Sequence, residues 1–313
     1  MSSLTGSLPQ LGLLRFAGAD AIPFLQGQIT NDARRLAAGH GLLAAVANPQ
    51  GRVLAVPQLL PHPDGVLAIL PRELLEPTAG WLRRFVLRAK LAIEIVGDAL
   101  AVAGATDPAP LAAAGLDLPA APDGYRQTGL VGIGCVLGDP RRFWIVAPPA
   151  TLAARGLAGD PADAARRAHD WRLMDVRAGL AAVYAATREA FIPQMLNLDL
   201  VGAISFQKGC YTGQEIVART QHLGRIKRRL LRVRTRGDAP LGASVRLPDG
   251  RIGRLTELQS AEDGYEGLAV APLAPAGAAG ADEEPAAAAN PAGETPIAAE
   301  ILPLPYALTP APG

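Results

Sequence analysis

The chain has 313 residues and nearly balanced charge, with 30 lysines and arginines against 29 aspartates and glutamates. A net charge near +1 argues against a protein that holds nucleic acid by bulk electrostatics, although a local patch could still do so. Two cysteines exclude a disulfide framework, no apolar run reaches the ~18 residues of a membrane helix, and no signal-peptide pattern opens the chain, so we expect a cytoplasmic protein.

The first predicted domain, residues 1–105, begins with a helix. Asp20 precedes apolar residues at helical spacing, so residues 24–28 are expected to be helical. Gln26 and Gln28 then lie on the polar side of this segment.

Strands and a second helix follow. Residues 48–51 have the composition of a turn and join the expected strands 42–47 and 53–56 into a hairpin. An apolar stripe at helical spacing predicts a helix over residues 74–85, and the next strand covers 91–96. This order favours an α+β sandwich over an alternating parallel fold. Three cations lie outside the helical stripe: Arg83, Arg84 and Arg88.

The second predicted domain, residues 106–224, starts with an Ala/Pro-rich connection. Apolar segments at 130–137 and 143–146 flank a turn and predict a hairpin. Asp163 is a candidate cap for a helix that runs through Trp171 to Val176 and ends near Gly179.

Short alternating segments in residues 225–313 predict a small β-barrel. Its expected strands are 230–235, 243–247 and 252–255. Alanine, proline and glycine dominate the stretch 271–299, which we expect to be a flexible insertion because it cannot bury enough apolar surface. A last strand is expected over 301–306.

Eight consecutive residues form the most specific local pattern: Lys208-Gly209-Cys210-Tyr211-Thr212-Gly213-Gln214-Glu215. Thr212 and Glu215 have the spacing of a capping box, which predicts a helix start. Cys210 lies just outside this start and two residues after Lys208, and both neighbours favour the thiolate form. It is therefore a candidate reactive cysteine. The alternative is a small buried hydrophobic residue between glycines that only shape a turn.

A basic strip follows the motif and contains no acid. Its members are Arg219, Arg225, Lys227, Arg228, Arg229, Arg232, Arg234 and Arg236. Such a strip could bind the carboxylates of a glutamylated cofactor, a phosphate backbone or an acidic protein, or could be one solvated face of a barrel strand.

The remaining patterns indicate no intrinsic metal site. The four histidines are scattered without zinc-ligand spacing. Two cysteines cannot enclose an iron–sulfur cluster, although Cys210 could be one transient ligand of a shared cluster. Trp171, on a predicted helix, could stack on a flat heterocycle or simply fill the core.

Taken together, four stretches resemble the YgfZ family of folate-binding proteins: residues 24–32, 191–194, 197–198 and 204–219. That family is related to the aminomethyltransferase, or T-protein, of glycine cleavage and to a mitochondrial factor that matures iron–sulfur proteins. The resemblance spans about residues 11–255 and returns at 302–306. It implies two interleaved α+β domains, ferredoxin-like or T-protein-like, around a central channel that binds tetrahydrofolate, plus a C-terminal β-barrel.

The resemblance also implies roles for individual residues. Lys208, Cys210, Tyr211 and Glu215 match its functional motif. The residues expected at the folate site are Gln26, Gln28, Trp171, Asn197, Gln214 and Arg219.

Two departures from the relatives matter. A second folate-site tryptophan in the best-known relative falls at Leu11 here. The aspartate pair of the aminomethyltransferase falls at Ala55 and Val56, so this strand supplies no carboxylate for acid–base chemistry.

Three functions remain open at this point. The first is a tetrahydrofolate-binding factor that makes or repairs iron–sulfur proteins, including one that methylthiolates tRNA, with Cys210 either ligating iron or capturing a one-carbon unit. The second is a folate-dependent one-carbon transferase with Cys210 as nucleophile. The third and weakest is a tRNA-binding module on the basic strip, because near-neutral charge and the lack of an RNA-recognition motif make direct nucleic-acid binding unlikely.

Overall fold

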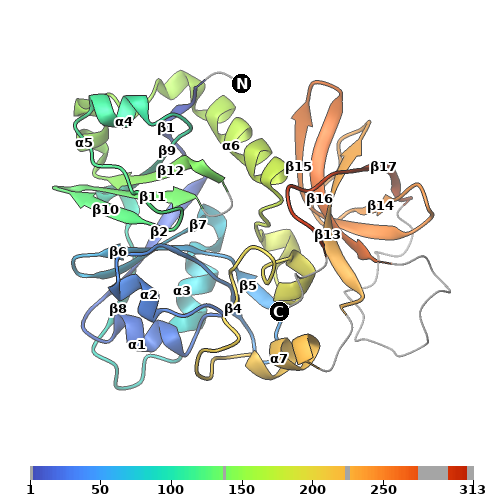
Figure 1. The fold of residues 1–313 in the computed structure, drawn as a ribbon, viewed down its shortest axis with the longest axis horizontal. Helices are drawn as coiled ribbons and strands as arrows, with labels where there is room; N and C mark the ends of the chain where they lie inside the picture. The colour runs from blue at the N-terminus through green and yellow to red at the C-terminus, as the bar shows by residue number, and fades with distance from the viewer. Residues whose placement is uncertain (1–2, 137–138, 223–225, 274–294, 309–313) are drawn as a thin grey trace. The chain divides into compact units, whose positions relative to one another are not determined.

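The computed structural model describes residues 3–136, 139–222, 226–273 and 295–308 (Figure 1). The chain divides into two compact units, each built from separate stretches of sequence. The first unit comprises Met1–Val46, Ala55–Trp171 and Gln207–Tyr211, and the second comprises Ala47–Leu54, Arg172–Phe206 and Thr212–Gly313. The motif around Cys210 is thus shared between the two units.

Two five-stranded antiparallel sheets form the first unit. One has the order β3-β6-β7-β2-β8, with β2 (Leu11–Ala17), β3 (Leu42–Leu43), β6 (Gln58–His62), β7 (Gly65–Pro71) and β8 (Ala92–Ile95). The other has the order β1-β9-β12-β11-β10, with β1 (Thr5–Ser7), β9 (Ala101–Ala105), β10 (Tyr125–Thr128), β11 (Val131–Val136) and β12 (Asp139–Ala147).

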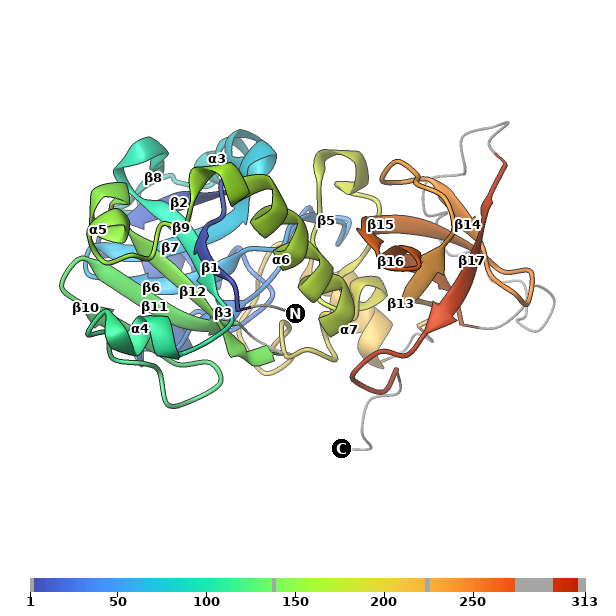
Figure 2. The same cartoon turned by 90° about the horizontal axis from the view of Figure 1, so that it is seen from above.

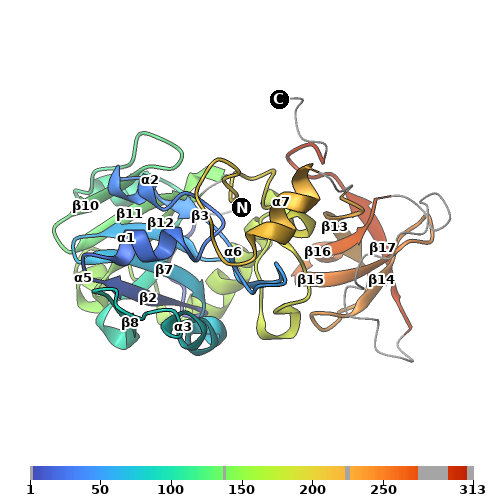
Figure 3. The ribbon, with the colours of Figure 1, turned by 90° about the horizontal axis from the view of Figure 1, so that it is seen from below.

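Three helices cover the β2-containing sheet. They are α1 (Ala21–Gln26), α2 (Arg34–Ala37) and α3 (Leu75–Arg83), the last preceded by the 3-10 turn η1 (Arg72–Leu74). The apolar spacing predicted two of them, although the one expected over 24–28 begins earlier, at Ala21, and ends at Gln26, and the helix at Arg34–Ala37 was not predicted. Figure 3 shows α1 and α2 next to each other. Leu25 of α1 and Leu82 of α3 are each 1% exposed, so both helices bury their apolar side.

The hairpin around residues 48–51 is present. Asn48 N–H donates to the carbonyl of Arg52 over 2.9 Å, and Gly51 has φ +70°, which suits a glycine. The strand expected over 42–47 is instead two short strands, because β3 pairs with β6 whereas β4 (Val46–Ala47) pairs with β5 (Val53–Ala55).

The β9-containing sheet has its own apolar core. Leu111 of α4 (Ala109–Ala113) and Leu152 of α5 (Pro149–Ala154) pack onto it with no exposed area. The long helix α6 (Ala164–Ala178) follows the 3-10 turn η3 (Pro161–Asp163). Asp160 caps η3, since its side chain accepts the N–H of Ala162 over 2.9 Å. Asp163 ends η3 and directly precedes α6, and its capping of α6 stays a prediction.

The second unit contains the predicted barrel, which is closed in the order β13-β16-β15-β14-β17. Its strands are β13 (Arg228–Thr235), β14 (Ser244–Arg246), β15 (Ile252–Ala261), β16 (Gly264–Pro272) and β17 (Ile297–Leu302). Figure 2 shows β17 beside β14, with which it pairs in parallel. The unit also contains the turn between β4 and β5, the end of α6, the 3-10 turns η4 (Ala185–Thr187) and η5 (Pro193–Leu196) and the helix α7 (Gln214–His222).

Two expectations for the barrel were wrong at their edges. The stretch 271–299 begins inside β16 and ends inside β17, while residues 274–294 lie outside the described residues. The last strand ends at Leu302 rather than continuing to Tyr306, because β17 pairs with β13 only as far as Leu302.

A buried ion pair fastens β13 to the segment after η5. Arg229 Nη1 lies 2.6 Å from Asp199 Oδ1, and the two side chains are 1% and 4% exposed. The same guanidinium also donates to the carbonyl of Gln194 over 2.9 Å. Removing either partner therefore leaves a buried charge without compensation.

We predict that Asp199→Ala lowers the free energy of unfolding by about 3–5 kcal/mol, because it strands the Arg229 guanidinium in the interior. The matched control, Asp249→Ala, breaks the more exposed Asp249–Arg251 pair and should cost at most about 1 kcal/mol. Urea denaturation followed by circular dichroism measures both, and equal losses would contradict the prediction.

Candidate functional site

Lys208 anchors the motif to the C-terminal end of α1. Its ammonium donates to the carbonyls of Gln26 and Ile29, each over 2.6 Å, and the residue is only 6% exposed. The last carbonyls of a helix lack intrahelical partners, and a cation is favoured there by the helix dipole. Lys208 therefore holds residues 207–211 against α1 within the first unit.

The surroundings of Lys208 set its charge. Burial lowers the pKa of Lys208 to about 8, Asp32 opposes this shift and Arg34 adds to it. The Arg34 guanidinium and main-chain N–H donate to Asp32 and hold the pKa of that carboxyl at about 2. Asp32 is a site residue that the sequence reasoning missed, although it ends one of the stretches that carry the family resemblance.

Tyr211 and Cys210 face different surroundings. The Lys208 ammonium lies 4.7 Å from the centre of the Tyr211 ring, a cation–π contact, and burial raises the pKa of the Tyr211 hydroxyl. Cys210 is exposed, unlike Cys135, which is buried in β11. Lys208 and Tyr211 are thus buried, whereas Cys210 between them is open to solvent.

The glycines of the motif differ in what they do. A Cβ on Gly209 would meet nothing within 4 Å, so this position has no steric need for glycine. Gly213 has φ +84°, and a Cβ there would lie 2.5 Å from the carbonyl oxygen of Asn48, so only glycine fits. The carbonyl of Gly213 accepts the N–H of Val217, which makes Gly213, not Thr212, the cap residue of α7.

The first turn of α7 is polar and open. Gln214 begins the helix, and Glu215 pairs with Arg219 one turn later over 3.2 Å. Their side chains are 81% and 64% exposed, so the pair contributes little to stability.

Two further expected folate contacts support the chain around them. Asn197 has φ +57° and no exposed area; its amide donates to the carbonyl of Leu230 and its oxygen accepts the N–H of the same residue. Gln26 uses its side-chain oxygen to accept the N–H of Ala33 over 2.8 Å. Gln28 is half-buried.

Trp171 lies in the core of the first unit. It is 1% exposed, its ring centre is 4.8 Å from that of Trp144, and the Arg142 guanidinium lies 4.9 Å from its ring. Gly104 makes room for it, because a Cβ there would be 2.3 Å from Cζ3 of Trp171. A ligand could stack on this ring only after a neighbour moved, so the expected folate contact stays a prediction.

The basic strip is not one free surface. Arg229 is buried against Asp199, and Arg232 Nη2 lies 2.5 Å from Glu266 Oε2 on the neighbouring strand. These two guanidinium groups are therefore occupied by carboxylates. Arg225 lies outside the described residues.

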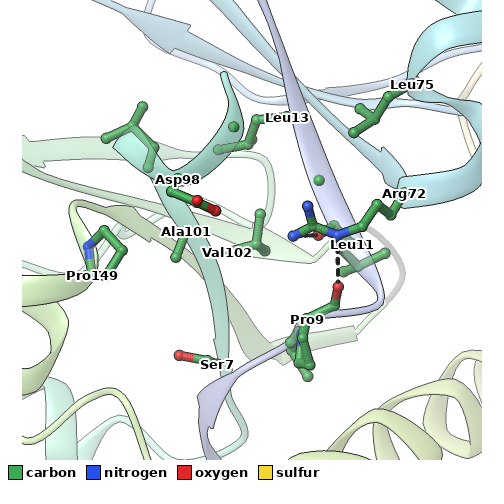
Figure 4. Close-up of a pocket in the computed structure, with 14 residues that line it drawn as sticks. Ser7, Pro9, Leu11, Leu13, Arg72, Leu75, Asp98, Ala101, Val102 and Pro149 are labelled. Atoms are coloured by element: carbon green, nitrogen blue, oxygen red, sulfur yellow. Dashed lines mark hydrogen bonds between the residues drawn. The ribbon is translucent and has the colours of Figure 1, made fainter. Parts of the chain in front are cut away.

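A cavity of about 130 Å³ opens in the first unit between β2 and β9 (Figure 4). Its apolar wall includes Leu11, Leu13 and Leu75, and the carboxylate of Asp98 and the guanidinium of Arg72 point toward each other from opposite sides. Arg72 Nε donates to the carbonyl of Pro9 over 3.0 Å, which fixes its orientation. None of the ion pairs in the described residues joins Arg72 to Asp98.

Within the described part of the chain, no three histidine, cysteine, aspartate or glutamate side chains gather as metal ligands. The same part contains no helix that is long and apolar enough to cross a membrane.

The fold is that of the glycine cleavage T-proteins. The aminomethyltransferase T of the glycine cleavage system from Bartonella henselae superposes with a TM-score of 0.66 over 85% of this chain and 77% of its own, at 17% sequence identity. This confirms the expected α+β, T-protein-like architecture with a C-terminal barrel.

Sequence comparison is more specific. The tRNA-modifying protein YgfZ of Hamiltonella defensa is 31% identical over 256 residues, which cover 80% of this chain and 73% of that protein. The protein of the same name from Yersinia pestis is 33% identical over 228 residues, 72% of this chain and 68% of its own. No protein-family model matches the chain. The chain belongs to the family of the tRNA-modifying protein YgfZ.

We predict that one of the two thiols reacts quickly with a disulfide reagent in the native protein. Cys210 is exposed, whereas Cys135 is buried and its pKa is raised by burial and by Asp123, so only Cys210 should react before unfolding. Absorbance of the released thiolate measures this, with Cys210→Ala as the control that removes the fast phase. Fast reaction of both thiols, or of neither, would contradict the burial pattern.

A second prediction concerns the Lys208 charge. Its pKa is about 8 when folded and about 10.5 when unfolded, so the unfolded state binds more protons between these values and stability should rise with pH there. From pH 7.5 to 9.5 the lysine should add about 2 kcal/mol to the free energy of unfolding, and Lys208→Met should lack this increment. Urea denaturation at the two pH values measures the difference, and an equal rise in the variant would exclude Lys208 as its source.

Proposed function

We propose that this protein binds tetrahydrofolate or a one-carbon derivative and supports the assembly or repair of iron–sulfur proteins, and through them tRNA modification. Its relatives are named tRNA-modifying proteins, and its fold is shared with an aminomethyltransferase of the glycine cleavage system. The observation that carries the proposal is that Cys210 is exposed on a segment that the buried Lys208 binds to the end of α1.

The cavity beside Leu11 supports the folate part of the proposal. Leu11 is the position at which the family resemblance puts a second folate-site tryptophan, and here it borders the open space. Pockets for whole drug-sized ligands measure roughly 300–1,000 Å³, so this cavity is large enough for one ring system only. Asp98 is suited to accept hydrogen bonds from the amino-pyrimidine edge of a pterin, and the leucines supply apolar contacts for its faces.

Cys210 is proposed to act on a client protein. An exposed thiol can lose its proton to solvent and bind iron at an open coordination position of a client cluster, and it can leave again by ligand exchange. The tightly bound Lys208 keeps the segment at a fixed place on the surface while the thiol exchanges.

The transferase alternative lacks one feature of the related enzyme. In β5, Val53, Leu54 and Ala55 are buried and apolar, so this strand offers no carboxylate to a folate nitrogen. A folate-dependent transfer would need its acid or base from elsewhere. Turnover of methylene-tetrahydrofolate by the purified protein, abolished in Cys210→Ala, would favour the transferase nonetheless.

We predict that anaerobic calorimetry detects tetrahydrofolate binding and that Asp98→Asn weakens it at least tenfold, because a hydrogen bond to a charged group contributes about 1.5–3 kcal/mol. Asp117→Asn, an exposed aspartate of the same unit, is the matched control and should bind as the wild type does. Leu11→Trp should reduce the volume of the cavity and change the affinity for tetrahydrofolate without unfolding the protein. Lack of binding by the wild-type protein would refute the folate proposal.

The role of the thiol is tested separately in cells that lack this protein. Cys210→Ser should bind tetrahydrofolate normally yet fail to restore the level of methylthiolated tRNA. Full restoration by this variant would remove Cys210 from the mechanism and leave the folate site untouched.

A further inference from the structure

A second polar surface lies at the end of α3, far along the chain from the Cys210 motif. We call residues 81–90, with the sequence Trp-Leu-Arg-Arg-Phe-Val-Leu-Arg-Ala-Lys, the 81–90 patch. Within these ten residues there are four cations and no acid. The patch belongs wholly to the first unit.

Aromatic rings form part of this patch. The ring centres of Trp81 and Phe85 are 5.6 Å apart, and the guanidinium of Arg84 lies 4.8 Å from the Trp81 ring. Both rings are half-buried, and Arg84 is exposed. The patch thus presents a planar cation next to partly exposed aromatic surface.

The cations that follow are available. Arg88 and Lys90 are exposed, and in the described part of the chain their side chains make no hydrogen bond or ion pair. Arg83 is held in place, since it donates to the carbonyl of Ile93 and lies 3.6 Å from Glu76. The other nearby acid, Asp20, accepts the main-chain N–H of Lys90 over 2.6 Å and forms no ion pair with the Lys90 side chain in the described residues.

Leu87 is the most exposed large apolar side chain among the described residues, at 87%. Leu87 lies between Arg84 and Arg88 in the sequence. A ligand that binds this patch can therefore make an apolar contact and contacts with cations at the same time. The basic strip of residues 219–236 offers no such combination, because its central arginines are paired with carboxylates.

We propose that the 81–90 patch is a binding surface for RNA, through an unpaired loop whose phosphates meet Arg84, Arg88 and Lys90 and whose base packs on Trp81 or Leu87. Unstacked bases in RNA loops stack on aromatic rings and on arginine planes, whereas paired RNA hides them. Three of the four cations are arginines, which match phosphate geometry in a way that lysines do not.

The charge balance of the whole chain agrees with a local surface of this kind. A net charge near +1 gives no general attraction to nucleic acid, so any RNA contact must come from a patch. A membrane surface fits less well, since one exposed leucine and two half-buried rings give little apolar area for insertion between lipids. This direct RNA contact goes beyond the proposed folate-dependent role and stands independently of it.

The test uses the full-length protein and fluorescently labelled unmodified tRNA. Anisotropy should show binding whose logarithmic affinity falls linearly with the logarithm of salt concentration. The double variant Arg88→Ala/Lys90→Ala should reduce this slope by roughly 1.5–2 and weaken binding roughly tenfold at 100 mM salt. The matched control is Arg236→Ala/Arg246→Ala, which removes two exposed cations of the barrel and should leave both values unchanged.

Tryptophan fluorescence gives a second readout. Trp144 and Trp171 are buried, so quenching by RNA should come from Trp81 and disappear in Trp81→Phe. Equal weakening by both double variants would show that binding is diffuse and overturn the proposal. Absence of tRNA binding would overturn it as well, as would tighter binding to phosphatidylserine vesicles than to tRNA, which would make the patch a lipid surface.

Discussion

The arrangement of the candidate site depends on one ammonium group. The Lys208 side chain meets two main-chain carbonyls at the end of α1 that come from 182 and 179 residues earlier in the chain. Those carbonyls lie where the chain leaves the helix, and an unsatisfied buried carbonyl is costly. By satisfying them, Lys208 turns a late segment of the sequence into part of the first unit. The exposed position of Cys210 follows from that attachment, because the residues on both sides of it, Lys208 and Tyr211, are held in place.

Local patterns in the sequence were sufficient for most individual elements. Apolar spacing predicted α1 and α3, and turn composition predicted the hairpin around Gly51. Pairing partners were not predictable in the same way. The strand expected over 42–47 divides because its two halves pair with different strands, and β16 depends on neighbours on both sides that its own residues do not specify.

The sequence singled out candidate site residues but not the contacts that they make. Lys208 was singled out for its closeness in sequence to Cys210, whereas its contacts are with α1 and Tyr211. Asn197 was expected to face a ligand, yet its left-handed backbone and its bonds to Leu230 make it a support for β13. Such roles arise from residues distant in sequence, and a short motif carries no information about them. The family resemblance pointed to these positions, but it does not state which of them hold the protein together.

The discontinuity of the first unit has a consequence for biosynthesis. Residues 1–171 hold nearly all of its strands and helices, but the ammonium that completes the end of α1 is encoded more than thirty codons later. A nascent chain emerging from the ribosome therefore passes through a stage in which both sheets can form while the carbonyls of Gln26 and Ile29 still face water. Closure of that end waits until Lys208 has left the exit tunnel, so the exposed Cys210 thiol cannot take up its final position before then.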